Sequence, residues 1–192
     1  MLQEVVQQIE NTCRDKINEV HTSLPGEIIS FNPGAGTATV KPSGRFTTQN
    51  DKRLAYPQIS DVPVVFPYCQ SLSCGFAFPV KRGDNCLIVV SEVELDEWRS
   101  GAESESNLRF DLTSAICIPG LLCGGGDIIE QASKQNGVIM KAGDNLVMAT
   151  DDGITLDTGD TTLKLTDSGA ELTGNLKVKG SITATQSITP WA

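Results

Sequence analysis

Apolar and polar positions follow three different patterns along the chain and divide it into three segments. Residues 1–23 place apolar side chains at helical spacings, which predicts an N-terminal helix. Residues 24–122 hold short apolar runs between turn residues, which predicts a compact β domain. Residues 123–192 alternate apolar and polar positions in still shorter strands. We therefore expect a mainly β protein with one helix at its start and two β regions of different character.

The N-terminal helix is predicted over residues 2–22 by a narrow apolar stripe. Its members recur at spacings of three, four and seven residues, and they are Leu2, Val6, Ile9, Cys13 and Val20. A helix of about five turns is marginal in isolation. We expect it to pack on its own domain or on a neighbouring subunit, with a solvated helical tail as the alternative. Leu24-Pro25-Gly26 is expected to end it, because proline and glycine both interrupt the helical pattern.

The β domain begins with a predicted hairpin, in which turn residues 32–36 join two short strands. A short helical turn is expected at residues 94–98. The predicted strands cover residues 27–31, 37–41, 62–66, 75–78, 86–90 and 113–118. Short strands with turn-rich joints and one small helix suit a Greek-key barrel of the OB type.

The C-terminal segment carries apolar pairs at positions i and i+2, separated by turns such as Asp152-Gly153 and Gly159-Asp160. This alternation is typical of stacked short strands. The pairs are Val138/Met140, Leu146/Met148, Ile154/Leu156, Leu163/Leu165, Ala170/Leu172, Leu176/Val178 and Ile182/Ala184.

The apolar faces of these strands are too thin to enclose a core in a lone sheet. No Phe or Tyr follows Phe110, and Trp191 is the one aromatic residue of the segment. A single-chain β-helix would need a regular six-residue period, whereas the spacings from Leu146 onward are eight, nine, seven, six and six. Three chains around a shared axis fit better, because every strand edge would then be paired. We therefore predict a homotrimer in which residues 123–192 form an intertwined trimeric β-helix or β-prism.

The chain is acidic, with 15 Lys and Arg against 24 Asp and Glu and a formal net charge of −9. Nucleic-acid binding requires a basic surface and aromatic stacking platforms, so we expect no nucleic-acid partner. Docking on anionic lipid would also require clustered Lys and Arg. No apolar stretch approaches the roughly 18 residues of a membrane helix, and the N-terminus lacks the pattern of a signal peptide. We expect a soluble chain made in the cytoplasm.

The sequence offers few residues for catalysis. His21 is the single histidine, so a Ser-His-Asp or Cys-His arrangement would depend on a residue expected to lie on the N-terminal helix. The carboxylate pairs Asp151-Asp152 and Glu92/Glu94 fall at a turn and at a strand end, where surface charge is the simpler interpretation. We predict no enzyme activity, no catalytic residues and no cofactor.

Six cysteines lie in the first two thirds of the chain: Cys13, Cys69, Cys74, Cys86, Cys117 and Cys123. They form no CxxC pair, so the spacing suits zinc poorly and we predict no metal site. Without a secretory signal, buried free thiols are the expected state. Cys69 and Cys74 flank a short loop, and a disulfide between them in an oxidising medium is the alternative.

Several runs within residues 24–122 resemble the baseplate central-spike family of contractile-tailed phages. The C-terminal segment matches that family only in its style of repeat. The runs are DVPVVFP at residues 61–67, GFAFPVKRGD at 75–84, CLIVVSE at 86–92 and LDEW at 95–98, together with the hairpin of residues 26–40.

The resemblance implies an OB-fold domain beneath the tail hub and a trimeric point directed at the host. Sheath contraction would drive the point through the host outer envelope, so that genome delivery requires no catalysis by this chain. The implied location is the virion, at the tail baseplate, after synthesis in the host cytoplasm. The implied partners are two further copies of the chain, hub and baseplate proteins and, transiently, the host outer membrane.

Several spikes of this family end in a histidine-containing motif that binds an iron ion at the apex. This chain has no histidine after His21, so we predict no such site. Three copies of Trp191 would either close the apex or seat a separate tip protein, and a frayed terminus is the alternative. The apex candidates are Ile188, Pro190, Trp191 and Ala192.

A trimeric tail-fibre adhesin that binds a host surface receptor is the alternative function, because trimeric β-repeat shafts also carry receptor-binding tips. Adhesin tips usually form a globular, aromatic-rich end, whereas here the sequence stops within a few residues of the last repeat. We therefore expect a puncturing spike.

Overall fold

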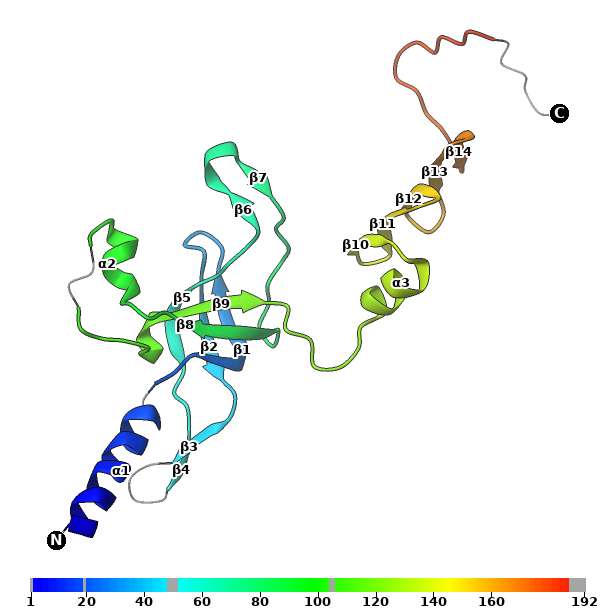
Figure 1. Cartoon of the computed structure of the whole chain (residues 1–192). Helices are drawn as coiled ribbons and strands as arrows, with labels where there is room; N and C mark the ends of the chain where they lie inside the picture. Colours follow the sequence, from blue (N-terminus) through cyan, green and yellow to red (C-terminus); the bar gives the residue numbers. More distant parts are fainter. Residues whose placement is uncertain (1, 19, 48–51, 104–105, 187–192) are drawn as a thin grey trace. The chain divides into compact units, whose positions relative to one another are not determined.

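The computed structural model describes residues 2–18, 20–47, 52–103 and 106–186. The chain divides into two units, Met1–Cys123 and Gly124–Ala192. Each unit is described separately below, and Figure 1 labels their helices and strands. Within the described residues, no helix is long and apolar enough to cross a membrane.

The first unit opens with α1 (Leu2–Asn18), which is shorter than the predicted helix of residues 2–22. The prediction that Leu24-Pro25-Gly26 ends the helix was wrong, because these residues lie within β1 (Ser23–Asn32). They pair with β8 (Asn85–Val90), where Gly26 lies opposite Cys86. A Cβ on Gly26 would meet Ile88 Cδ1 at 2.5 Å, so glycine here permits close packing of two strands and does not break a helix.

Five strands of the first unit form a curved sheet in the order β5-β2-β1-β8-β9, and every neighbouring pair is antiparallel. The two outer strands approach each other beyond the end of β5. Val64 forms a parallel bridge with Cys117, and the Val65 N–H donates to the Cys117 carbonyl at 2.9 Å. The sheet therefore curves into a half-barrel, and its two outer segments meet at this bridge. The strands not yet bounded are β2 (Thr37–Pro42), β5 (Ile59–Pro63) and β9 (Ala115–Pro119).

The concave side of this sheet holds the core. Its side chains alternate along the strands, as expected for a sheet with one buried face. Phe31 and Phe66 pack at the margin of the core, with ring centroids 6.4 Å apart. The fully buried members are Ile28, Val40, Val62, Cys86, Ile88 and Cys117. Burial of each large aliphatic side chain contributes about 1.5–3 kcal/mol, so this cluster is the main source of stability in the unit.

Short elements project from the half-barrel. Two hairpins extend away from the main sheet (Figure 1). One pairs β3 (Arg45–Thr47) with β4 (Arg53–Ala55), and the other pairs β6 (Tyr68–Cys69) with β7 (Cys74–Gly75). The 3-10 turn η1 (Gln70–Leu72) joins β6 to β7. The helix α2 (Leu95–Ser100) follows β8, close to the predicted turn at residues 94–98, and η2 (Leu112–Ser114) precedes β9.

Two strand predictions in this unit were wrong in extent. The strand expected at residues 75–78 is limited to β7, and the following segment is irregular. Phe78 instead packs its ring edge-to-face on Phe66, with centroids 5.3 Å apart. Pro79, which has no N–H to donate, cannot extend a strand ladder. The strand expected at residues 62–66 begins and ends earlier, as β5.

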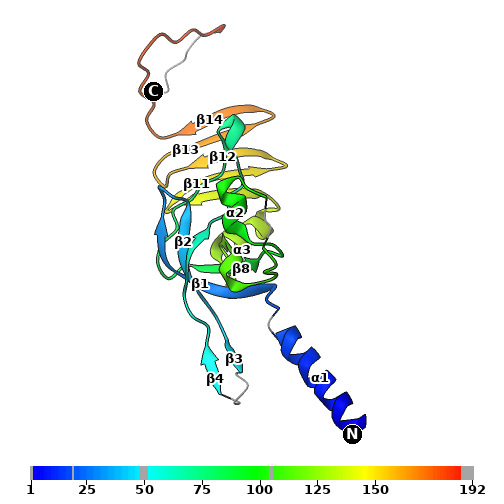
Figure 2. The ribbon, with the colours of Figure 1, turned by 90° about the vertical axis from the view of Figure 1, so that its left-hand side faces the viewer.

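The second unit is an antiparallel meander of five strands, preceded by a helix that the sequence pattern did not predict (Figures 1 and 2). The helix is α3 (Asp127–Gln135), and Gly126 accepts hydrogen bonds from Ile129 and Glu130 at its first turn. The strands are β10 (Val138–Ala142), β11 (Asn145–Thr150), β12 (Gly153–Asp157), β13 (Thr162–Thr166) and β14 (Gly169–Thr173). The expected pairs Leu176/Val178 and Ile182/Ala184 lie outside these strands.

Candidate functional site: an exposed apolar sheet face

The strand register of the second unit gathers apolar side chains on one face. Met140 lies opposite Val147, and Val147 also lies opposite Leu156. The row continues through Leu163 to Leu172. A parallel row connects residues 138, 149, 154, 165 and 170 in the same way. We call these ten positions the apolar face: Val138, Met140, Val147, Ala149, Ile154, Leu156, Leu163, Leu165, Ala170 and Leu172.

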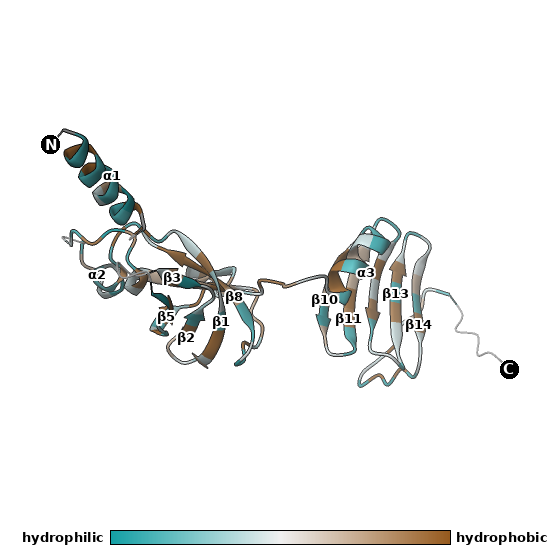
Figure 3. Ribbon diagram, turned by 90° about the horizontal axis from the view of Figure 1, so that it is seen from below, coloured by the Kyte–Doolittle hydropathy of each residue, from teal (hydrophilic) through white to brown (hydrophobic). Residues whose placement is uncertain are grey.

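The apolar face is open to solvent in the single chain. Val138 is 73% exposed, Met140 50%, Ile154 44% and Leu165 40%. In Figure 3, apolar segments recur on neighbouring strands of this sheet. Isolated exposed apolar residues are normal on a protein surface, but a contiguous set across five strands marks an interaction surface.

The opposite face of the same sheet is mixed: it carries Ile139, Leu146 and Met148 as well as charged side chains, and α3 lies on this side. The Lys141 ammonium pairs with the Asp127 carboxylate at 2.5 Å, which ties β10 to the first turn of the helix. The hydrogen bond from Lys141 and its positive charge hold the pKa of Asp127 below its usual value. Lys164 and Glu171 are opposite each other on β13 and β14. The sheet therefore has one apolar face and one mixed face, and the ion pair between Lys141 and Asp127 ties α3 to the mixed face.

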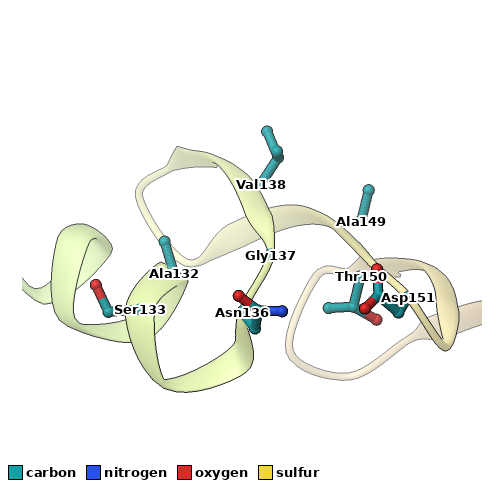
Figure 4. A pocket seen from close by; sticks show the side chains of 8 residues that line it. All are labelled: Ala132, Ser133, Asn136, Gly137, Val138, Ala149, Thr150 and Asp151. Carbon is teal, nitrogen blue, oxygen red and sulfur yellow. The ribbon is translucent and has the colours of Figure 1, made fainter.

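A pocket of about 580 Å³ lies where α3 ends and β10 begins (Figure 4). Its lining contains one carboxylate, that of Asp151, among small apolar, amide and hydroxyl side chains. In Figure 4 the side chains of Val138 and Ala149 point to the same side of their strands, as their membership of the apolar face requires. The pocket brings together no acid–base pair among the residues that line it. The lining residues are Ala132, Ser133, Asn136, Gly137, Val138, Ala149, Thr150 and Asp151.

The residues considered for catalysis are dispersed. The sequence pattern predicted His21 on the N-terminal helix, but α1 ends before it. The ring of His21 contacts that of Tyr56 edge-to-face, with centroids 5.7 Å apart. Asp151 and Asp152 occupy the turn between β11 and β12. Glu94 stands at the N-terminal cap of α2 without a capping side-chain hydrogen bond. Within the described ranges, no group of three or more His, Cys, Asp or Glu side chains is placed to hold a metal ion.

The predicted apex residues Ile188, Pro190, Trp191 and Ala192 lie outside the described residues. Among the described residues, the candidate surface is the apolar face. The alternating pairs in the sequence did signal an apolar face, but for β11, in place of Val147 and Ala149, they named Leu146 and Met148. The register shows that these two residues lie on the other side of the sheet, together with Ile139.

The apolar stripe of α1 is also exposed. Val6 and Ile9 of the predicted stripe are about half exposed, and the neighbouring Val5 and Ile17 are half exposed or more. The expectation that α1 packs on its own domain is thus not met in the single chain. The stripe remains free to contact a neighbouring subunit or solvent.

The six cysteines are free thiols. The expectation that they are buried holds for Cys86 and Cys117 and is wrong for the others. The hydrogen bond with Cys86 and burial raise the pKa of Cys117, so this thiol stays protonated. The four exposed thiols are Cys13, Cys69, Cys74 and Cys123.

Residues 24–120 match the family model described as the phage protein Gp138 N-terminal domain, which is a little more than half of the 192-residue chain. The chain belongs to this family. Membership of the Gp138 N-terminal domain family supports a phage structural protein with a role in the baseplate or tail, and hence a virion component. A search among curated proteins finds no match to the chain.

The family match and the apolar face concern different parts of the molecule. The matched residues cover β1 through β9, which is the half-barrel and its projecting elements. The second unit, with the apolar face, follows the matched region. The family match thus rests on the half-barrel, and the apolar face lies outside the matched residues.

Proposed function

We propose that this chain is the central spike of the baseplate of a contractile phage tail, a non-enzymatic homotrimer that punctures the host outer envelope when the sheath contracts. The observation that carries the proposal is the apolar face of the second unit, which is exposed in the single chain. A second copy and a third copy of the same face are the partners that cover it.

The chemistry of the sheet favours other copies of this chain as the cover. The apolar face is only about two residues wide on each strand, so it suits a slender shared core and not a broad sandwich. A three-sided prism places these rows at a common axis and leaves Lys164 and Glu171, on the opposite face, in water. Removing the exposed aliphatic surface from water stabilises the assembly by about 25 cal/mol for each Å² buried.

The first unit serves as the base in this proposal. The order β5-β2-β1-β8-β9, with the parallel bridge from Val64 to Cys117 between its outer strands, supports a five-stranded barrel of the OB type. Family membership supports its place in a phage baseplate or tail. Hub proteins above this base and, where present, a separate tip protein are the further partners.

The proposed action is mechanical. The contracting sheath supplies the work, and the spike must resist bending and splaying while it crosses the envelope. Hydrogen-bonded ladders join each strand of the second unit to the next from β10 to β14, which makes each sheet stiff along the stack. A dry apolar axis would hold the three sheets together without any catalytic residue.

The first test is the native mass of the purified chain. We expect three times the subunit mass of 20.5 kDa by light scattering or native mass spectrometry. Leu156→Asp places a charge on the apolar face and should reduce the trimer to monomers, because three buried carboxylates would meet near the axis. Thr155→Asp, on the adjacent position and the opposite face, is the matched control and should remain trimeric. A monomeric wild-type chain would refute the trimer.

The second test separates the spike from the tail-fibre adhesin. Particles assembled with a chain that stops after Gly180 should attach to host cells at the normal rate but fail to deliver their genome, because the penetrating end is lost. Attachment is measured by depletion of free particles, and delivery by loss of host viability. If attachment falls in parallel with delivery, the chain is an adhesin. A variant carrying Leu176→Ala in the full-length chain controls for assembly of the particle.

A further inference from the structure

The β6–β7 hairpin places two exposed cysteines directly opposite each other. Cys69 pairs in register with Cys74, next to the pair of Tyr68 and Gly75. Directly opposed residues of an antiparallel pair have Cα atoms about 4.5–5.5 Å apart. That separation falls inside the range of roughly 4.4–6.8 Å found in disulfides. The backbone thus presents the two thiols at a distance that a disulfide can span.

The strands are held close together at this point. The Phe76 N–H donates to the Pro67 carbonyl at 2.9 Å. A Cβ on Gly75 would meet Tyr68 Cα at 2.6 Å, so only glycine allows this approach beside Cys74. The hairpin therefore holds Cys69 and Cys74 together before any covalent bond joins them.

The environment of Cys69 favours its reactive form. The Cys69 Sγ lies 3.3 Å from the Ser71 Oγ. The hydrogen bond with Ser71 and that from the backbone N–H of Leu72 lower the pKa of the Cys69 thiol. The thiolate is the nucleophile in thiol–disulfide exchange, so Cys69 is the thiol expected to react first.

The other cysteines differ from this pair in exposure or in position. Cys86 and Cys117 lie on the neighbouring strands β8 and β9, but both are fully buried in the core and closed to reagents. Cys13 lies on α1, and Cys123 follows β9 at the end of the first unit. The hairpin is the place where two exposed cysteines face each other in register.

We propose that Cys69 and Cys74 form a dithiol site that reacts with small-molecule disulfides of the glutathione class and closes to an intrachain disulfide. The Cys69 thiolate attacks one sulfur of the reagent, forms a mixed disulfide and releases one reagent thiol. Cys74 then loses its proton, attacks the Cys69 sulfur and releases the second reagent thiol. Two electrons and two protons pass from the cysteine pair to the reagent, which is reduced to two thiols.

The disulfide would fix an apolar loop. Leu72, between the two cysteines, is 75% exposed, and Phe76 beyond β7 is 65% exposed. Closure joins the two strands covalently at the base of η1 and restricts the conformations of this loop. A chain released from a reducing cytoplasm into an oxidising medium would undergo this closure. The inference does not depend on the proposed function, because it uses only the hairpin.

The test uses the full chain carrying Cys13→Ser and Cys123→Ser, which removes the two other exposed thiols. The reduced protein is exposed to oxidised glutathione and analysed by intact mass and by peptide mapping after thiol alkylation. We expect the mass to fall by two hydrogen atoms, with Cys69 and Cys74 protected from alkylation. Adding Cys74→Ser should halt the reaction at a glutathione adduct on Cys69, whereas adding Cys69→Ser should slow it by about tenfold or more.

Three results would overturn the proposal. The first is a stable glutathione adduct when both cysteines are present, because it would show that the hairpin does not bring Cys74 into reach. The second is no reaction at Cys69 or Cys74 while a small alkylating reagent modifies both. The third is equal reaction rates for the two single variants, which would remove the preference for attack by Cys69.

Discussion

At the residue scale, isoleucine side chains in regular strands are buried in one unit and exposed in the other. Ile88 in β8 is fully buried, whereas Ile154 in β12 is 44% exposed, although both alternate with neighbours in antiparallel strands. The difference comes from what lies across from the strand. The half-barrel curves back over Ile88, whereas within the described part of the second unit no element packs closely enough on Ile154 to bury it. Exposure of aliphatic residues in these regular strands is therefore the observation that motivates the proposed trimer.

The core of the half-barrel should be sensitive to single truncations. We expect Ile88→Ala to lower the free energy of unfolding of the first unit by about 2–5 kcal/mol, because it leaves a cavity among fully buried neighbours. Ile17→Ala on α1, where the side chain is 71% exposed, is the matched control and should cost less than about 1 kcal/mol. Chemical denaturation followed by far-UV circular dichroism measures both. Equal losses in the two variants would show that the barrel core does not dominate stability.

At the element scale, strands with clear alternation could be predicted from the sequence, and elements that depend on tertiary contacts could not. Residues 37–41 and 86–90 were predicted almost to the residue, because apolar runs bounded by turn residues leave one interpretation. The helix α3 was missed because its nine residues follow a glycine-rich joint. Its contacts with β10, including Lys141 to Asp127, are not visible in a linear pattern.

The same distinction applies to the candidate site. Alternation in residues 138–172 predicted an apolar face, but only the register decides which positions share it. Leu146 and Met148 form an alternating pair like the others, yet the pairing of Met140 with Val147 places them on the opposite side. The register in turn follows from short turns such as Gly143-Asp144, which fix how β10 meets β11.

At the scale of the whole molecule, the two units differ in whether they can complete a core alone. The first unit encloses Ile28, Val40 and Ile88 within its own half-barrel. The second unit has a sheet with no buried hydrophobic residue in its five strands among the described residues. Its stability must therefore come from association if the proposed trimer is correct, whereas the stability of the first unit should come mainly from its own fold.

This difference predicts that the two units respond differently to protein concentration. Association stabilises the folded state by mass action, so the Tm of the second unit should rise when the chain is concentrated, while that of the first unit stays nearly constant. Differential scanning calorimetry over a hundredfold concentration range should resolve the two transitions, and Leu156→Asp should remove the concentration dependence of one of them. If the Tm of both transitions is independent of protein concentration in the wild-type chain, the apolar face is not an oligomer interface. A monomeric sheet would unfold at the same temperature at every concentration.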